Sequence, residues 1–142
     1  MRRWLKFFVT LVLALSIAFS AVPITSYAAS TAADQKQTAK KFNKFLKKYF
    51  YSDDIQDVKI SYKKTGKRYT FTMTFTTKNI TKDMTNGVNA NLHQQLLTAF
   101  AKTSKSQYKN AKKMGLKKPI VRVIWITADG YKVASIKNGT LE

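Results

Sequence analysis

The first regular pattern of apolar and polar residues in this chain lies in the segment TAKKFNKFLKKYFY, residues 38–51. Its apolar residues recur at the three- and four-residue spacing of a helix, at Phe42, Phe45, Leu46, Tyr49 and Phe50. Lysines at positions 40, 41, 44, 47 and 48 fall on the opposite side. The pattern predicts an amphipathic helix from about Asp34 to Phe50, whose apolar side we expect to cover a sheet.

The period then changes to two, which is typical of half-buried strands. One alternating segment has Val58, Ile60 and Tyr62 as its apolar residues, and the next has Tyr69, Phe71, Met73 and Phe75. A hairpin with Thr65-Gly66 as its two-residue loop would join them. That loop would place Tyr62 opposite Tyr69, Ile60 opposite Phe71 and Val58 opposite Met73, so that the apolar side chains share one face.

A second helical pattern covers about Thr85 to Met114. Its apolar side comprises Val88, Leu92, Leu96, Phe100 and Ala111. Asp83 is the expected N-cap, and Gly115 followed by Pro119 supplies a stop. An unbroken helix here would be about 45 Å long, so we expect a kink or break near residues 102–106.

Two further strands end the chain. Ile120 to Thr127 is almost continuously apolar, and Tyr131 to Ile136 follows after the turn residues Ala128-Asp129-Gly130. The order is therefore helix, hairpin, helix, hairpin (αββαββ). We expect a single α+β domain over residues 38–142, with a four-stranded antiparallel sheet and both helices packed on one face.

The N-terminal residues have the pattern of a secretory signal peptide. Arg2, Arg3 and Lys6 precede an apolar run from residue 7 to residue 22, and small residues follow. Ser26 and Ala28 fit the −3 and −1 positions of a cleavage site, so we expect residues 1–28 to be removed and residues 29–37 to form a flexible leader. An uncleaved anchor is the alternative, but the apolar run is shorter than the ~20 residues that a spanning helix needs. We expect a secreted protein, extracellular or associated with the cell wall, with no stable transmembrane insertion after cleavage.

The chain contains no cysteine. This excludes disulfide bonds, thiolate chemistry and lipid attachment at a cysteine. A secreted domain without disulfides must be stabilised by its core alone, which favours a bacterial source.

Charge is the strongest compositional signal. The chain carries 26 basic and seven acidic residues, for a formal net charge of +19. Loss of residues 1–28 would remove three basic and no acidic residues, leaving 23 against seven, or +16. Of those 23, only Arg68 and Arg122 are arginine. Lysine is a point charge that lacks the planar fork of arginine, so the balance favours salt-sensitive attraction to a polyanion over sequence readout.

The lysines concentrate on the outer sides of the two predicted helices. Residues 84–128 contain no carboxylate at all, and such a one-sided excess costs self-repulsion that an anionic neighbour would offset. The alternative is that these lysines only solubilise the helices and complement their dipoles. The predicted polyanion-binding residues are Lys40, Lys44, Lys47 and Lys48 on the first helix and Lys102, Lys105, Lys109 and Lys112 on the second.

The residues that usually carry catalysis are scarce. His93 is the sole histidine and Glu142 the sole glutamate, and Asp53, Asp54 and Asp57 form the one acidic cluster. His93 is interpreted as a partly buried structural residue, and the aspartates as turn caps. No P-loop, G-x-S-x-G or zinc signature occurs. We expect no enzyme activity, no metal and no cofactor.

Three functions fit these observations. The first is non-specific electrostatic binding of an anionic partner, either a cell-wall polymer or extracellular nucleic acid. The second is a secreted inhibitor or interaction module whose hairpin tip, residues 63–68, enters an acidic cleft of a partner protein. The third is antimicrobial membrane disruption by the first helix.

Overall fold

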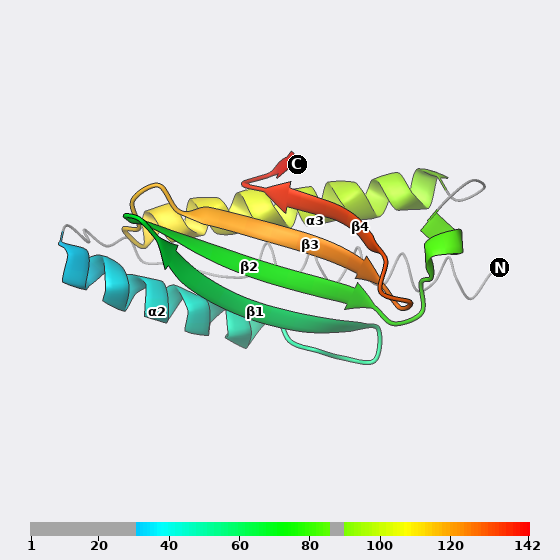
Figure 1. The fold of residues 1–142 in the computed structure, drawn as a ribbon, viewed down its shortest axis with the longest axis horizontal. Coiled ribbons are helices and arrows are strands. Elements are labelled where there is room, and N and C mark those ends of the chain that lie inside the picture. The colour runs from blue at the N-terminus through cyan, green and yellow to red at the C-terminus, as the bar shows by residue number, and fades with distance from the viewer. Residues whose placement is uncertain (1–30, 86–89) are drawn as a thin grey trace.

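The computed structural model describes residues 31–85 and 90–142, which form two α-helices and a sheet (Figure 1). The elements are α2 (Ala32–Tyr49), β1 (Gln56–Thr65), β2 (Arg68–Thr77), the 3₁₀ helix η1 (Lys82–Thr85), α3 (Ala90–Lys113), β3 (Ile120–Thr127), β4 (Lys132–Lys137) and β5 (Thr140–Leu141). The predicted signal peptide, residues 1–28, lies outside the described residues and stays a prediction.

The sheet has five strands in the order β1-β2-β3-β4-β5. All neighbours are antiparallel except β2 and β3, which are parallel with Thr70 opposite Ile120. The α+β class is confirmed, whereas the four-stranded, wholly antiparallel sheet is wrong. The reason is that α3 is unbroken: its 24 residues extend for about 36 Å and carry the chain back to the end of the sheet where β2 begins. The short strand β5 was not predicted.

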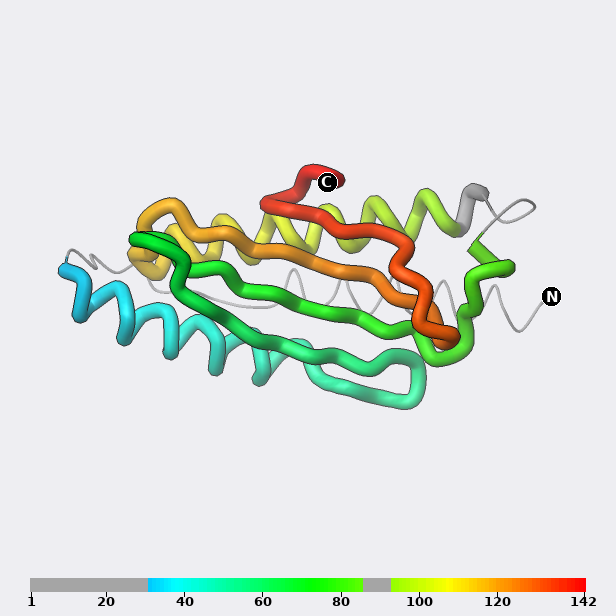
Figure 2. Tube along the Cα trace, viewed as in Figure 1, coloured from blue at the N-terminus to red at the C-terminus, as the bar shows by residue number. Residues whose placement is uncertain are grey.

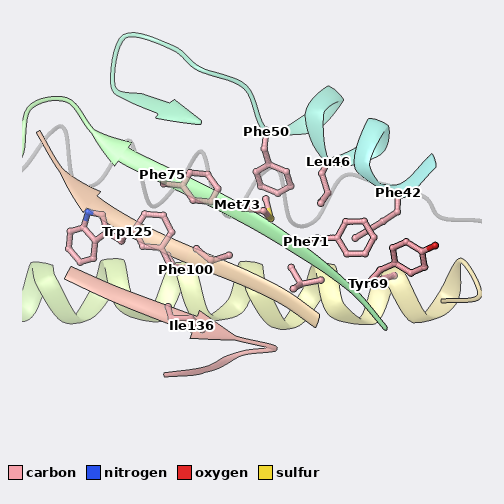
Figure 3. Packing of buried hydrophobic residues seen from close by; sticks show 14 of the residues in the cluster. Phe42, Leu46, Phe50, Tyr69, Phe71, Met73, Phe75, Phe100, Trp125 and Ile136 are labelled. Carbon is pink, nitrogen blue, oxygen red and sulfur yellow. The ribbon is translucent and has the colours of Figure 1, made fainter. Parts of the chain in front are cut away.

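Both helices pack on one face of the sheet, as predicted. Figure 1 shows α2 along the β1 edge and α3 behind β3 and β4. From α2, the ring of Phe42 meets that of Phe71 edge-on at 4.8 Å between centroids. From α3, the ring of Phe100 lies 5.2 Å from that of Phe75 and 5.5 Å from that of Trp125. These aromatic side chains form one fully buried core (Figure 3).

The start of α2 is set by a capping box. The Thr31 hydroxyl accepts a hydrogen bond from the Asp34 N–H, and the Asp34 carboxylate accepts one from the Thr31 N–H. Gln35 then ties this end of α2 to the loop before β3, because its Nε2 donates to the Gly115 carbonyl and its Oε1 accepts from the Lys117 N–H. Residues 32–37, predicted as part of a flexible leader, are therefore the first turns of α2.

The hairpin β1–β2 forms, but its predicted register is wrong by two residues. Tyr62 lies opposite Phe71 rather than Tyr69, and Ile60 lies opposite Met73 rather than Phe71. The loop residues are Gly66 and Lys67, since Thr65 pairs with Arg68. Gly66 has a φ of +63°, which a two-residue loop of the II′ type requires at its first position. Glycine must therefore lead the loop, and the shift of two leaves the apolar residues on the predicted face.

Helix α3 differs from its prediction at its start and its middle. Asp83 is not an N-cap of α3 but lies in η1. The helix is continuous from residue 90 to residue 113, without the break expected at residues 102–106. Leu96, Phe100 and Ala111 are fully buried as predicted. Val88 and the side chain of Leu92 lie outside the described part.

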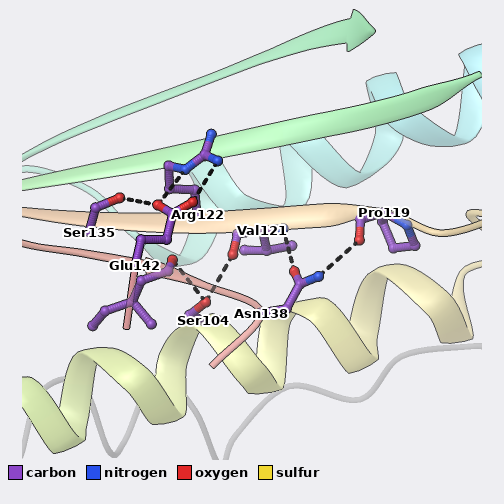
Figure 4. Close-up of polar contacts among 8 residues, drawn as sticks. Ser104, Pro119, Val121, Arg122, Ser135, Asn138 and Glu142 are labelled. Atoms are coloured by element: carbon purple, nitrogen blue, oxygen red, sulfur yellow. Dashed lines mark hydrogen bonds and ion pairs between the residues drawn. The ribbon is translucent and has the colours of Figure 1, made fainter. Parts of the chain in front are cut away.

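The segment where a break was expected supplies a buried polar contact to the sheet instead. Ser104 is fully buried, and its hydroxyl donates to the Val121 carbonyl at 2.9 Å (Figure 4). The same oxygen accepts a hydrogen bond of 3.0 Å from the Gly139 N–H. Gly139 has a φ of +89°, and a Cβ atom there would lie 2.7 Å from the Cβ of Lys105. One serine thus holds α3 against both β3 and the turn between β4 and β5.

None of the helices in residues 31–85 and 90–142 is long and apolar enough to cross a membrane.

Replacement of Ser104 by alanine should lower the free energy of unfolding by about 1–3 kcal/mol, because the Val121 carbonyl loses its buried hydrogen bond from Ser104 and the Gly139 N–H loses its acceptor. Ser106→Ala is the matched control on the same helix, at a half-buried site with no side-chain hydrogen bond to the described residues. It should change stability by less than about 0.5 kcal/mol. Urea denaturation measures both variants, and equal stabilities would show that the Ser104 contact does not hold α3 to the sheet.

Candidate polyanion-binding surface

The four predicted lysines of α2, Lys40, Lys44, Lys47 and Lys48, are all exposed. They face solvent because Ala39, Phe42 and Leu46 occupy the side of the helix that packs on the sheet, where each is fully buried. The Nζ of Lys48 lies 5.6 Å from the centre of the Tyr49 ring, so its stem runs along the helix surface. The row ends in the last turn of α2, where cations complement the helix dipole.

The four predicted lysines of α3, Lys102, Lys105, Lys109 and Lys112, are exposed as well. Lys102 and Lys105 border a pocket of about 390 Å³ between α3 and the β4–β5 turn. The Nζ of Lys112 lies 5.5 Å from the centre of the Tyr108 ring. The inner side of the helix is occupied by buried residues such as Phe100 and Gln107, so the lysines cannot turn inward.

Carboxylates do not neutralise either row. Within residues 31–85 and 90–142 the structure contains two ion pairs, Lys78 with Asp57 and Arg122 with Glu142. None of the eight predicted lysines takes part in them. A row of lysines without carboxylate partners keeps its positive potential and its counterions.

The fold sets the two rows apart. Both helices cover the same face of the sheet (Figure 1), and the lysines lie on the exposed sides of the helices. However, α2 packs along β1 while α3 packs on β3 and β4. The structure therefore presents two separate stripes of lysine rather than one patch.

A second group of cations was predicted only in part: residues 63–68 were considered as a hairpin tip that enters a partner's cleft, but their meeting with residues 117–118 was missed. The structure places Lys64, Lys67 and Arg68 of the β1–β2 hairpin beside Lys117 and Lys118 of the loop before β3, around one pocket. The signal was present in the sequence, since both turns are runs of basic residues. It could not be used because the sequence did not define the order of the strands, so the two turns could not be assigned to the same end of the sheet.

His93 has a structural role in the described chain, as interpreted. Its ring meets Trp125 edge-on at 5.4 Å between centroids, and its Nδ1 lies 2.8 Å from the Thr85 carbonyl oxygen. A carbonyl can only accept a hydrogen bond, so Nδ1 carries the hydrogen. His93 thus joins α3 to η1 and to β3.

The acidic cluster serves as turn caps and in an ion pair. Asp53 Oδ1 accepts hydrogen bonds from the N–H groups of Ile55 and Gln56, at 2.8 and 2.9 Å. Asp57 lies 3.4 Å from the Nζ of Lys78. Within the described ranges no three of the His, Cys, Asp and Glu side chains gather as metal ligands would.

The sole glutamate pairs with one of the two arginines outside the first 28 residues. Arg122 donates from Nε and Nη2 to the two carboxylate oxygens of Glu142, each at 2.9 Å, and the Ser135 hydroxyl also donates to Glu142 (Figure 4). The Arg122 hydrogen bond and then that of Ser135 lower the pKa of Glu142 from 4.5 to about 2. This bidentate pair lies on the sheet face opposite the helices, and it engages two of the three guanidinium nitrogens of Arg122.

Comparisons with protein-family models, with curated proteins and with solved structures give no match.

The Glu142 carboxyl should titrate near pH 2 in the folded protein. Because the folded pKa lies below its usual value, the pair stabilises the protein fully above about pH 4.5, and this contribution is lost as the pH falls toward 2. Glu142 is the only glutamate, so ¹³C labelling of glutamate yields a single carboxyl resonance. In Arg122→Gln the midpoint should move toward 4.5, whereas Arg68→Gln should leave it in place. A midpoint near 4.5 in the parent protein would contradict the ion pair.

Proposed function

We propose that this protein is a small secreted cationic binding protein, without enzyme activity, that associates electrostatically with an anionic polymer outside the cell. The observation that carries the proposal is the exposure of all eight predicted lysines with no carboxylate partner among the described residues. Binding releases the counterions condensed on the polymer, and that release supplies the driving force. The partner is a cell-wall polymer or extracellular nucleic acid, bound through its charge rather than its sequence.

The distribution of lysine and arginine supports non-specific attraction. Both helix stripes consist of lysine alone, and Arg122, one of the two arginines in residues 29–142, is held by Glu142. Lysine offers no planar fork with which to select a base or a fixed phosphate geometry. Two flexible rows of ammonium groups therefore favour contact with any polymer of sufficient charge density. Release to the cell exterior rests on the N-terminal sequence pattern.

The membrane-disruption alternative conflicts with the packing of α2. Its aromatic side would have to enter the bilayer, yet Phe42, Leu46 and Phe50 are buried against the sheet. Exposing each of these side chains would cost about 1.5–3 kcal/mol. We therefore do not propose insertion of α2 into membranes. The inhibitor alternative keeps one supporting feature, since residues 63–68 at the hairpin tip are all exposed.

Glutamine at Lys40, Lys44, Lys47 and Lys48 should weaken binding to duplex DNA and to isolated bacterial cell walls. If all four lysines contact DNA phosphates, the slope of log K against log salt should become shallower by up to about 3.6. The same change at Lys102, Lys105, Lys109 and Lys112 should act likewise. Thermal midpoints should stay within a few degrees of the parent, because surface substitutions change stability by about 0.5 kcal/mol or less.

The matched control replaces four exposed lysines off the two helices, Lys59, Lys63, Lys82 and Lys132, by glutamine. It removes the same charge and should retain most of the binding. If the control and the helix variants lose affinity equally, net charge alone drives binding and the stripes are not the site. Undiminished binding by both helix variants would also refute the proposal.

A further inference from the structure

A basic pocket of about 920 Å³ lies at the end of the sheet where the β1–β2 hairpin turns. The start of α2, the hairpin tip and the loop before β3 meet at this end (Figure 2). Its lining residues are Thr31, Ala32, Gln35, Lys64, Thr65, Gly66, Lys67, Arg68, Tyr69, Lys117 and Lys118. Five of these eleven side chains are cationic and none is acidic.

The pocket is built from segments held in place by hydrogen bonds. Arg68 Nε donates to the Lys118 carbonyl at 3.1 Å, which joins the hairpin to the loop before β3. Gln35 joins that loop to α2 through its bonds to Gly115 and Lys117. Lys118 has a φ of +49°, in the left-handed region, so the loop has a fixed and unusual turn at this point. These hydrogen bonds hold the segments that carry the cations in place relative to one another around the pocket.

Arg68 differs from the lysines around it. Its bond to Lys118 uses Nε, so the guanidinium plane is oriented while the two terminal nitrogens are not engaged by that bond. Two parallel N–H groups at the end of a guanidinium match two oxygens of one phosphate. The surrounding lysines supply point charges for further phosphate oxygens.

One carboxylate lies beside the pocket, and its single negative charge leaves an excess against the five cations. Asp34 is absent from the lining, and its carboxylate accepts the Thr31 N–H in the capping box. The pocket therefore keeps a clear excess of positive charge at a size that holds more than one anionic group. A single phosphate would be too small to contact all of these cations.

We propose that this pocket binds a chain of contiguous phosphate groups, either free oligophosphate or the triphosphate of a nucleotide. Arg68 holds one phosphate with its terminal nitrogens, and Lys64, Lys67 and Lys118 contact the others. This site is distinct from the helix stripes of the proposed function: it saturates at one ligand per chain, whereas the stripes bind polymer along their length. Its existence does not depend on whether the stripes bind polymer.

The test is isothermal titration of the purified protein with inorganic tripolyphosphate. We expect one saturable site and binding at least about tenfold weaker with orthophosphate, which cannot reach all the cations. The variant Lys64→Gln/Lys67→Gln/Lys118→Gln should bind tripolyphosphate about tenfold or more weakly. Arg68→Lys keeps the charge but removes the planar guanidinium with its parallel N–H donors, and should also weaken binding of tripolyphosphate. Titration with ATP distinguishes free oligophosphate from the triphosphate of a nucleotide. Equal affinities for ATP and tripolyphosphate indicate that the phosphates alone are recognised.

The control Lys59→Gln/Lys82→Gln/Lys132→Gln removes the same charge away from the pocket and should bind tripolyphosphate like the parent. The two quadruple helix variants should do so too, which separates this site from polymer binding. Binding without saturation, or equal losses in the pocket and control variants, would overturn the proposal. Thermal midpoints of all variants show whether any loss comes from misfolding.

Discussion

The parallel pairing of β2 with β3 fixes where the charged groups of this protein lie. Because Thr70 pairs with Ile120, both strands begin at the same end of the sheet. The two basic turns that precede them, at residues 66–67 and 117–118, must therefore meet there. The same pairing requires α3 to run back along the sheet, which places a second helix beside α2 on one face. Both the basic pocket and the position of the α3 stripe follow from this one connection.

The apolar core explains why the lysines remain outside. The inner face of the sheet carries Phe71, Met73, Phe75, Val123 and Trp125, all fully buried. These apolar side chains must be shielded from water, and the apolar sides of α2 and α3 pack over them. The indole N–H of Trp125 donates a hydrogen bond to the Thr77 hydroxyl at 3.1 Å, so this polar group has a partner inside the core. The aromatic residues of α2 are thus needed by the fold, and only its charged side is available to a partner.

The sequence predicted the elements better than their connections. Periodicity located both helices and all four long strands, because an apolar face of period 3.6 or two is set locally. The hairpin register failed because the pattern alone allows any shift of two, and only the positive φ of Gly66 selects one. The prediction of a wholly antiparallel sheet was wrong because the direction of β3 depends on whether α3 runs unbroken along the sheet, and a break was expected there. The exposed lysines were predictable from helical periodicity, whereas the pocket needs segments 50 residues apart in the chain to meet.

A distance across the basic pocket tests the central claim most directly, and the absence of cysteine makes it straightforward. Spin labels on the double variant Lys67→Cys/Lys118→Cys would report the separation of the two basic turns by their dipolar coupling. Parallel pairing predicts neighbouring labels, since Arg68 Nε lies 3.1 Å from the Lys118 carbonyl oxygen. An antiparallel β3 beside β2 would place residue 118 at the far end of the sheet, about 25 Å or more away over eight residues of strand. A separation of that size would contradict the topology and, with it, the basic pocket.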